Sequence, residues 1–183
     1  MQLEQTSWME VREKLKKPQG IIMATGSTEQ HGPIGLIGTD TICSETIASD
    51  VAVRANMYLA PSIGFTPAEF NMKFPGTISV SEQTFKSLLR DVTSSLLKHG
   101  FEYVLIVNGH GANIDPIKDV MIDFKNKLFF KSWWDFPTVK NIRNKEFGDW
   151  EGMHATPSEI SITQINQRVI DNIEFKKIAQ NPP

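Results

Sequence analysis

A glycine-rich segment at residues 26–40 carries three side chains of the types that bind hard divalent cations. They are Glu29, His31 and Asp40. Four glycines and a proline in the same segment favour a loop over a helix or a strand. The apolar run 21–24 precedes this loop and a segment of helical pattern follows it, which is where α/β proteins place functional loops. The loop is therefore a candidate metal site, with a simple polar turn as the alternative.

The positions of the histidines favour the metal site. The chain has four histidines, and only His99 lies at the end of an ordinary predicted helix. The other three, in glycine-rich or turn-rich loops, are His31, His110 and His154. Because the carboxyl ends of parallel strands meet at one edge of a sheet, we expect these three loops to converge.

The acidic residues that accompany these histidines are Glu29, Asp40 and Glu159. Imidazole and carboxylate without thiolate suit Zn²⁺ or Mn²⁺ in a catalytic site, whereas structural zinc sites favour cysteine. Two metals would need a shared carboxylate, and Asp40 is the best-placed candidate. Asp40 also stands where the N-cap of the next helix would stand, so both roles remain open. We assign proton transfer to His154, as a histidine outside the ligand set.

Signals for other chemistries are weaker. Ser27, Ser44, Ser62 and Cys43 are candidate nucleophiles, but none lies in a Gly-x-Ser-x-Gly elbow. No segment matches a phosphate-binding loop or the glycine pattern of dinucleotide-binding folds. A net charge of −2 without a basic block argues against nucleic acid as a partner.

The elements that must position these residues alternate along the chain. Strands are expected at 21–25, 57–61, 102–107 and 128–134, and helices at 7–17, 41–55, 82–99, 114–128 and 158–169. Residues 62–77 and 135–153 are predicted to be irregular, and the last residues through Pro183 an exposed tail. Alternating strands and helices predict an α/β fold with a mainly parallel sheet covered on both faces.

Bulk properties predict one domain over residues 1–183. The single cysteine fits a reducing compartment. There is no signal-peptide pattern and no apolar run of membrane-spanning length, so we expect a soluble, cytoplasmic protein without a membrane partner. Among the aromatic residues, we expect Trp133 and Trp134 in the core or a subunit interface and Trp150 in a substrate pocket.

Four segments resemble the signatures of the creatininase (creatinine amidohydrolase) family. They are Gly26-Ser-Thr-Glu-Gln-His-Gly-Pro33 with Gly38-Thr-Asp40, Phe74-Pro-Gly-Thr-Ile-Ser79, Asn108-Gly-His-Gly-Ala-Asn113, and His154-Ala155 followed by Glu159. The four lie in family order and extend over residues 26–161, most of the chain. The resemblance implies a three-layer α/β/α sandwich, a two-metal amidohydrolase site and often a homohexamer.

Carried over by position, the resemblance implies two divalent ions, with Zn²⁺ favoured and Mn²⁺ or Fe²⁺ as alternatives. Glu29 and His110 would bind one metal, His31 and Glu159 the other, and Asp40 would bridge them. His154 would be the proton-transfer histidine. Two departures affect this assignment. Ala112 replaces a glutamate of the creatinine-hydrolysing members, which argues against creatinine itself, and Pro157 can shift the turn that presents His154 or Glu159.

Only about two dozen residues follow Glu159, so a C-terminal segment of the family is expected to be absent or reduced. The predicted function is a metal-dependent hydrolase of a non-peptide C–N bond in a cyclic amide or formamide. A metal-bound hydroxide would attack the carbonyl, and His154 would protonate the leaving nitrogen. The expected partners are a small-molecule amide substrate and further copies of the chain. The alternative is a non-catalytic or assembly subunit that keeps the fold and the metal site.

Overall fold

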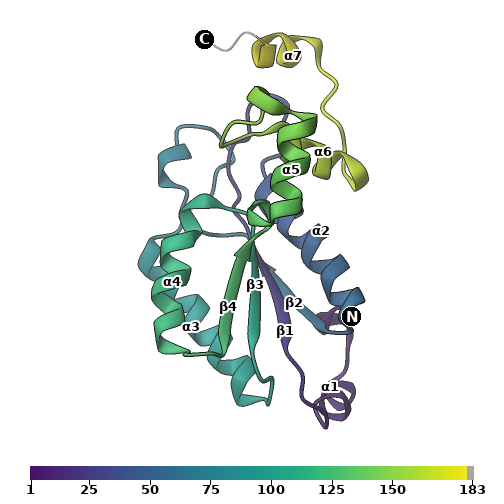
Figure 1. Cartoon of the computed structure of the whole chain (residues 1–183). Helices are drawn as coiled ribbons and strands as arrows, with labels where there is room; N and C mark the ends of the chain where they lie inside the picture. Colours follow the sequence, from purple (N-terminus) through teal and green to yellow (C-terminus); the bar gives the residue numbers. More distant parts are fainter. Residues whose placement is uncertain (181–183) are drawn as a thin grey trace.

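Four parallel strands form the centre of the molecule, and helices cover both faces of this sheet (Figure 1). The computed structural model describes residues 1–180, with side chains described through Lys177. The strands are β1 (Ile21–Thr25), β2 (Tyr58–Ile63), β3 (Val104–Asn108) and β4 (Leu128–Ser132). The α-helices are α1 (Trp8–Lys14), α2 (Thr39–Arg54), α3 (Glu82–Lys98), α4 (Ile114–Asp123), α5 (Pro137–Glu146), α6 (Pro157–Asn166) and α7 (Ile173–Gln180). The predicted three-layer α/β/α sandwich is confirmed.

Strand β1 lies between β2 and β3 in the sheet order β2-β1-β3-β4. All five of its residues are buried, which suits an uninterrupted apolar run in a parallel sheet with both faces covered. In the register of β1 and β3, Ile21 is opposite Val104 and Thr25 is opposite Asn108. The carboxyl ends of these two strands therefore lie side by side, and the loops that follow them start from adjacent points.

The two faces of the sheet pack against different helices. On one face, Phe85 and Leu89 of α3 and Ile117 of α4 pack with alternate strand residues such as Ile106. The other face is covered by α2, whose small inward residues allow a close approach to the sheet. These residues are Cys43, Ala48 and Ala52. Helix α6 packs in turn against α2, so the far end of the chain reaches the same edge as the loop after β1.

Local signals in the sequence explain the start of α1 and both ends of α3. Ser7 caps α1 in a capping box with Glu10, and Ser81 caps α3 by accepting a hydrogen bond from the backbone N–H of Thr84. Gly100 follows α3 with a φ of 105°, a left-handed conformation that glycine adopts without strain. The predicted starts of α1 and α3 are correct within a residue.

The prediction of irregular structure over residues 135–153 is wrong in part, because residues 137–146 form α5. The tail is exposed over residues 171–177 as expected, and it contains the helix α7. Helix α5 contains no fully buried residue and only two apolar residues after its first proline, of which Val139 is partly buried and Ile142 is exposed, so its apolar pattern is too weak to predict a helix. Its start is marked by Pro137 at the first helical position, where the fixed φ of proline is favourable. The prediction for residues 181–183 lies outside the described residues.

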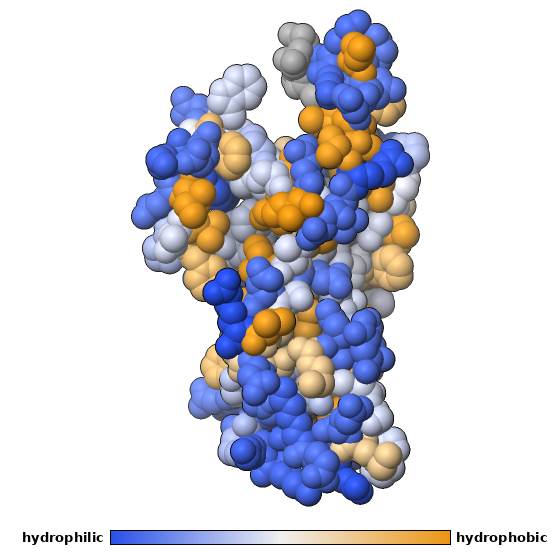
Figure 2. All heavy atoms as spheres, turned by 90° about the vertical axis from the view of Figure 1, so that its right-hand side faces the viewer, coloured by the Kyte–Doolittle hydropathy of each residue, from blue (hydrophilic) through white to orange (hydrophobic). Residues whose placement is uncertain are grey.

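Apolar side chains are unevenly exposed on the molecular surface. Figure 2 shows apolar patches toward the end where the strands finish, whereas the opposite end is mainly hydrophilic. The irregular segment 62–77 contributes three exposed aromatic rings, Phe65, Phe70 and Phe74. Within the described residues, no helix has the length and apolarity that crossing a membrane requires.

Candidate metal centre

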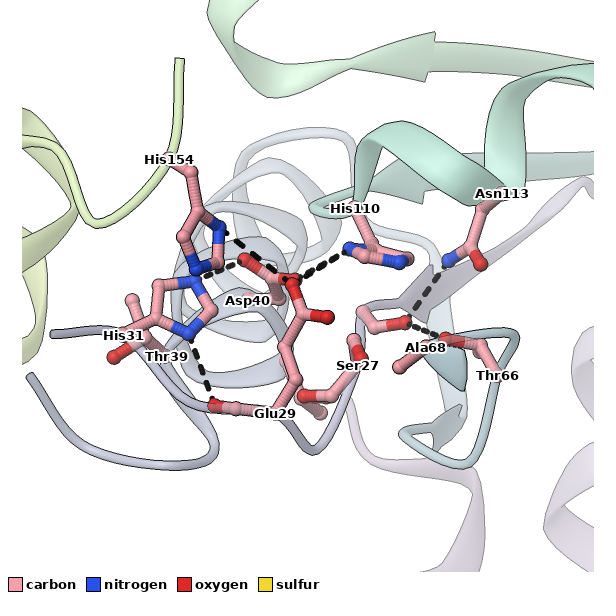
Figure 3. Close-up of polar contacts among 12 residues, drawn as sticks. Ser27, Glu29, His31, Thr39, Asp40, Thr66, Ala68, His110, Asn113 and His154 are labelled. Atoms are coloured by element: carbon pink, nitrogen blue, oxygen red, sulfur yellow. Dashed lines mark hydrogen bonds and ion pairs between the residues drawn. The ribbon is translucent and has the colours of Figure 1, made fainter. Parts of the chain in front are cut away.

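The three loop histidines and the three carboxylates converge at the carboxyl ends of β1 and β3. Glu29 and His31 come from the loop after β1, Asp40 from the first turn of α2, and His110 from the residues directly after β3. Figure 3 shows these side chains pointing toward one another, together with His154 from the segment before α6. The convergence expected from parallel strand topology is therefore present.

Asp40 is common to two groups of metal-binding atoms. One group contains Glu29, Asp40 and His110, and the other contains His31, Asp40 and Glu159. In each group the ligand atoms lie within 4.8 Å of one another, and all of these residues are buried. Two triads that share one carboxylate form the arrangement that two adjacent cations require.

His31 presents one ring nitrogen to the loop backbone and the other to Asp40. Nδ1 lies 3.1 Å from the carbonyl oxygen of Glu29. A carbonyl only accepts hydrogen bonds, so this contact places the proton of a neutral ring on Nδ1. Nε2 then carries the lone pair, and it lies 2.8 Å from Oδ1 of Asp40. The lone pair therefore faces the shared carboxylate.

His110 repeats this pattern with its ring nitrogens exchanged. Nε2 lies 2.9 Å from the carbonyl oxygen of Pro67, which fixes Nδ1 as the nitrogen that faces the carboxylates. Nδ1 is 2.8 Å from Oδ2 of Asp40 and 3.2 Å from Oε1 of Glu29. Within residues 1–180, neither of these buried oxygens has a hydrogen-bond partner with acceptable geometry. Two unsatisfied carboxylate oxygens facing an imidazole lone pair fit a bound divalent cation.

The same crowding shifts the pKa values of the buried groups when no cation is bound. Burial alone would favour the neutral ring of His110, but Asp40 and Glu29 outweigh it and raise its pKa to about 10. Burial also opposes the charged forms of His31 and Asp40, yet their mutual contact raises the pKa of His31 and, with His110, lowers that of Asp40. Protons and metal cations therefore compete for these nitrogens.

His154 differs from the other members of the site in its exposure. Its side chain is 38% exposed, and Nε2 lies 2.8 Å from the carbonyl oxygen of Gln30. That contact directs Nδ1 inward, to 3.7 Å from Oε1 of Glu29. The ring lies 4.4 Å from the ring of His31, measured between centroids. Solvent access and an inward nitrogen suit a group that exchanges protons, although the position also groups with Glu29 and His31 as a metal-binding set.

Asp40 and Glu159 both lie in the first turn of a helix, and the sequence alone did not predict how each is placed there. Asp40 is not the N-cap of α2, because Gly38 takes that position and Asp40 lies in the first helical turn. Glu159 forms a capping box with Thr156, whose backbone N–H donates to Oε2 at 2.7 Å. Burial raises the pKa of Glu159, and the hydrogen bonds from Thr156 oppose that shift. Pro157 occupies the first position of α6, where it is compatible with the helix.

A cavity of about 600 Å³ opens beside these residues. Its wall includes Trp133 and Trp134, of which Trp133 also belongs to the core as expected. Trp150, which was expected in a substrate pocket, does not line this cavity, and the residue is 85% exposed. The irregular segment 62–77 contributes Phe70, whose ring stacks on that of His110 at 6.0 Å between centroids.

Sequence reasoning did not single out Asn108, which supports the loop of His110. Its Oδ1 accepts from Thr25 Oγ1, the backbone N–H of His110 and Asn113 Nδ2, at 3.1, 3.2 and 3.2 Å. Its Nδ2 donates to the carbonyl of His110 at 2.8 Å and to Ser132 Oγ at 3.1 Å. Asn71 was missed as well, and its Nδ2 donates to Oε2 of Glu29 at 3.0 Å. Asn108 could have been found from the sequence, because it is a polar residue at the end of an otherwise apolar strand.

Comparisons with known proteins identify the family of this chain. The family described as "Creatininase: Creatinine amidohydrolase" matches residues 4–171. The 3-dehydro-scyllo-inosose hydrolase of Thermotoga maritima is 35% identical over 104 residues, which cover 56% of this chain and 33% of that protein. The creatinine amidohydrolase of Pseudomonas putida is 21% identical over 197 residues, covering 97% of this chain and 75% of that protein.

The fold has a counterpart among solved structures. A structure described as "Creatininase Mn" superimposes with a TM-score of 0.71 at 21% identity, covering 84% of this chain and 68% of that one. This likeness concerns the fold alone. The chain spans only about a third of the length of the Thermotoga maritima hydrolase that it matches.

Proposed function

Because this chain belongs to the creatininase family, we propose that it is a metal-dependent hydrolase of a non-peptide C–N bond, in a cyclic amide or a formamide. The observation that carries the proposal is the position of Asp40 in two buried triads of metal-binding atoms. A purely structural carboxylate would be satisfied by its neighbours, whereas Oδ2 of Asp40 and Oε1 of Glu29 have no hydrogen-bond partner in the part of the chain that the structure describes.

In this proposal the ligands are divided between two divalent ions, with Asp40 shared. Glu29 and His110 would hold one ion, His31 and Glu159 the other, and Asp40 would offer one oxygen to each. Imidazole and carboxylate ligands favour Zn²⁺, with Mn²⁺ and Fe²⁺ as alternatives. When bound, such ions supply Lewis acidity that activates water and polarises a carbonyl.

The protein's own groups orient the reaction around this site. The carbonyl oxygens of Glu29 and Pro67 fix the ring orientations of His31 and His110. His154 accepts and releases the proton at Nδ1, because Nε2 is engaged by the carbonyl of Gln30. In amide hydrolysis this proton goes to the leaving nitrogen, which departs as a neutral amine.

The cavity beside the site would hold the substrate. Phe70, Trp133 and Trp134 provide flat apolar walls for a small ring or planar amide. Trp150 remains a proposed contact for a substrate that extends beyond this cavity. We also propose a homo-oligomer, a hexamer by resemblance to the family, which light scattering of the purified protein would test.

The function is tested by metal content and turnover together. The purified chain is analysed by plasma mass spectrometry and then assayed with cyclic amides, formamides and short peptides, before and after chelation. We expect turnover of a cyclic amide or formamide that chelation abolishes and added Zn²⁺ or Mn²⁺ restores. Metal binding without turnover of any compound would favour the alternative of a non-catalytic or assembly subunit. Turnover that survives complete removal of metal would contradict the proposal.

The variant His110→Ala provides the residue-level test. Removal of this ring eliminates one ligand and one wall contact, so we expect loss of bound metal together with loss of turnover. His99→Ala, at the C-terminal end of α3, is the matched control because it removes a histidine outside the site. Full metal content and turnover in His110→Ala would contradict the assignment.

A further inference from the structure

One cationic side chain lines the cavity beside the candidate metal centre. Arg143, in the last turn of α5, is the only lysine or arginine among the described residues of the cavity wall. Its side chain is only 18% exposed, which is unusual for an arginine. No part of the proposed reaction uses this charge. A half-buried guanidinium in a substrate cavity therefore needs an explanation of its own.

Contacts on two sides hold the guanidinium in place. Nε donates to Oε1 of Glu151 at 2.6 Å, and the guanidinium carbon lies 5.7 Å from the centroid of the Trp133 ring. Glu151 is itself buried and also accepts a hydrogen bond from the hydroxyl of Ser158. The orientation of Arg143 is therefore fixed by packing and by a charged hydrogen bond.

The ion pair of Arg143 and Glu151 is not bidentate. A bidentate pair would use both carboxylate oxygens, but Oε2 of Glu151 has no hydrogen-bond partner among the described residues. The contact engages Nε alone, and within the described part of the chain the two Nη groups of Arg143 make no hydrogen bond to protein. Planar, preoriented N–H donors of this kind match a carboxylate or phosphate group.

The same contacts connect this cation to the metal-binding residues. Ser158, which donates to Glu151, directly precedes Glu159 in the first turn of α6. Trp133, which packs on the guanidinium, lines the same cavity as Asp40 and Glu159. One bound molecule would therefore meet the candidate metal centre and the guanidinium within a single cavity.

We propose that the Nη groups of Arg143 bind an anionic group of the substrate, so that the hydrolysed molecule is an amide carrying a carboxylate or a phosphate. This inference rests on the proposed function, in which the same cavity holds the scissile C–N bond. Glu151 and Trp133 orient the guanidinium, and a negative group of the substrate would accept charge-assisted hydrogen bonds from its Nη groups. Arg143 thus selects substrates by charge, while the metal centre acts on the amide.

Paired probes with and without an anionic group test this proposal. N-formylglycine is compared with neutral N-formylglycinamide, and N-formylethanolamine phosphate with N-formylethanolamine, which distinguishes a carboxylate from a phosphate. Each probe is assayed for turnover and, by calorimetry, for binding to the metal-loaded protein. The variants are Arg143→Gln, Arg143→Lys and the control Arg90→Gln. Arg90 makes an equivalent Nε contact, at 2.6 Å to Asp123, on the outer surface of α3.

For the wild type and Arg90→Gln, we expect tighter binding of an anionic probe than of its neutral partner by about tenfold to 100-fold. Arg143→Gln should remove this preference by weakening the anionic probe alone, with KM affected more than kcat. Arg143→Lys should retain part of it, because the charge remains but the planar fork is lost. A preference that is unchanged in Arg143→Gln, or an equal loss for both members of a pair, would overturn the inference.

The inference and the proposed function fail in different ways. Turnover of formamides without any charge preference contradicts the role of Arg143 and leaves hydrolysis standing. Anion binding that requires Arg143, without turnover of any probe, supports the anion site and contradicts hydrolysis of these amides. Equal circular dichroism spectra of wild type and Arg143→Gln establish that the variant is folded.

Discussion

Gly109 lies directly against the backbone of Asp40, so closely that a Cβ at position 109 would stand 2.2 Å from the carbonyl oxygen of Asp40. The loop after β3 and the first turn of α2 can therefore approach only because residue 109 has no side chain. This contact sets the distance between His110 and the shared carboxylate. The glycine is thus a geometric requirement of the candidate metal centre.

Gly109→Ala should displace the start of α2 and with it Asp40. A displacement of about 1 Å at a reacting site lowers turnover by about 100-fold, and we expect metal content to fall as well. The control is Gly111→Ala on the other side of His110, where an added Cβ meets nothing within 4 Å. Metal analysis and urea unfolding of both variants check this prediction. Wild-type metal content in Gly109→Ala would contradict it.

Asp40→Asn should affect both metals at once. The amide keeps the shape of the side chain but removes the negative charge that the two triads share. We expect less than one ion per chain after dialysis, because a neutral bridge cannot offset two cations. Asp50→Asn, an exposed position of the same helix, should keep the wild-type metal content. Retention of two ions by Asp40→Asn would exclude Asp40 as the bridging ligand.

The pKa of His110 predicts how the metal-free protein responds to pH. Its folded pKa is raised from 6.5 to about 10, so the protonated ring stabilises the fold fully below pH 6.5. This stabilisation is lost as the pH rises from there through about 10. The contribution of Asp40, whose pKa is lowered, does not change over the same interval. Urea unfolding in the presence of a chelator should therefore show stability falling between these limits.

His110→Gln removes the titrating ring and is the comparison for that experiment. Its stability should be lower than that of the wild type near pH 6 but should change less between pH 6 and 10. The effects of the titratable groups that both proteins share cancel in the difference. Parallel pH profiles of the two proteins would show that His110 carries no such linkage.

Asn108→Ala should destabilise the fold more than a typical buried substitution. The side chain makes five hydrogen bonds, and its removal takes the partner from the hydroxyls of Thr25 and Ser132 and from the backbone N–H of His110. Each buried unsatisfied group costs about 1–3 kcal/mol, so we expect a loss of at least about 3 kcal/mol. Asn141→Ala, at an exposed position of α5, should change stability by less than about 0.5 kcal/mol. Denaturant unfolding monitored by circular dichroism measures both.

The sequence alone determined the layout of the fold. The uninterrupted apolar run 21–25 predicted β1 because a central parallel strand needs burial on both faces, and Phe85 and Leu89 predicted α3 through their helical spacing. Helix α5 was not predicted because it contains no fully buried residue and only a weak apolar pattern. Burial of one face of an element produces a periodic apolar pattern in the sequence, whereas a mostly exposed helix produces no such pattern.

Ligand chemistry could likewise be predicted, since Glu29, His31 and His110 combine metal-binding side chains with glycine-rich loops after strands. Only the tertiary structure decided which ring nitrogen faces inward, because the carbonyls of Glu29 and Pro67 select it and Pro67 is 43 residues from His110. It also placed Trp133 rather than Trp150 at the cavity and brought Arg143 to its wall. Residue types are local information, but their directions depend on contacts between segments that are distant in the chain, and no periodicity encodes those contacts.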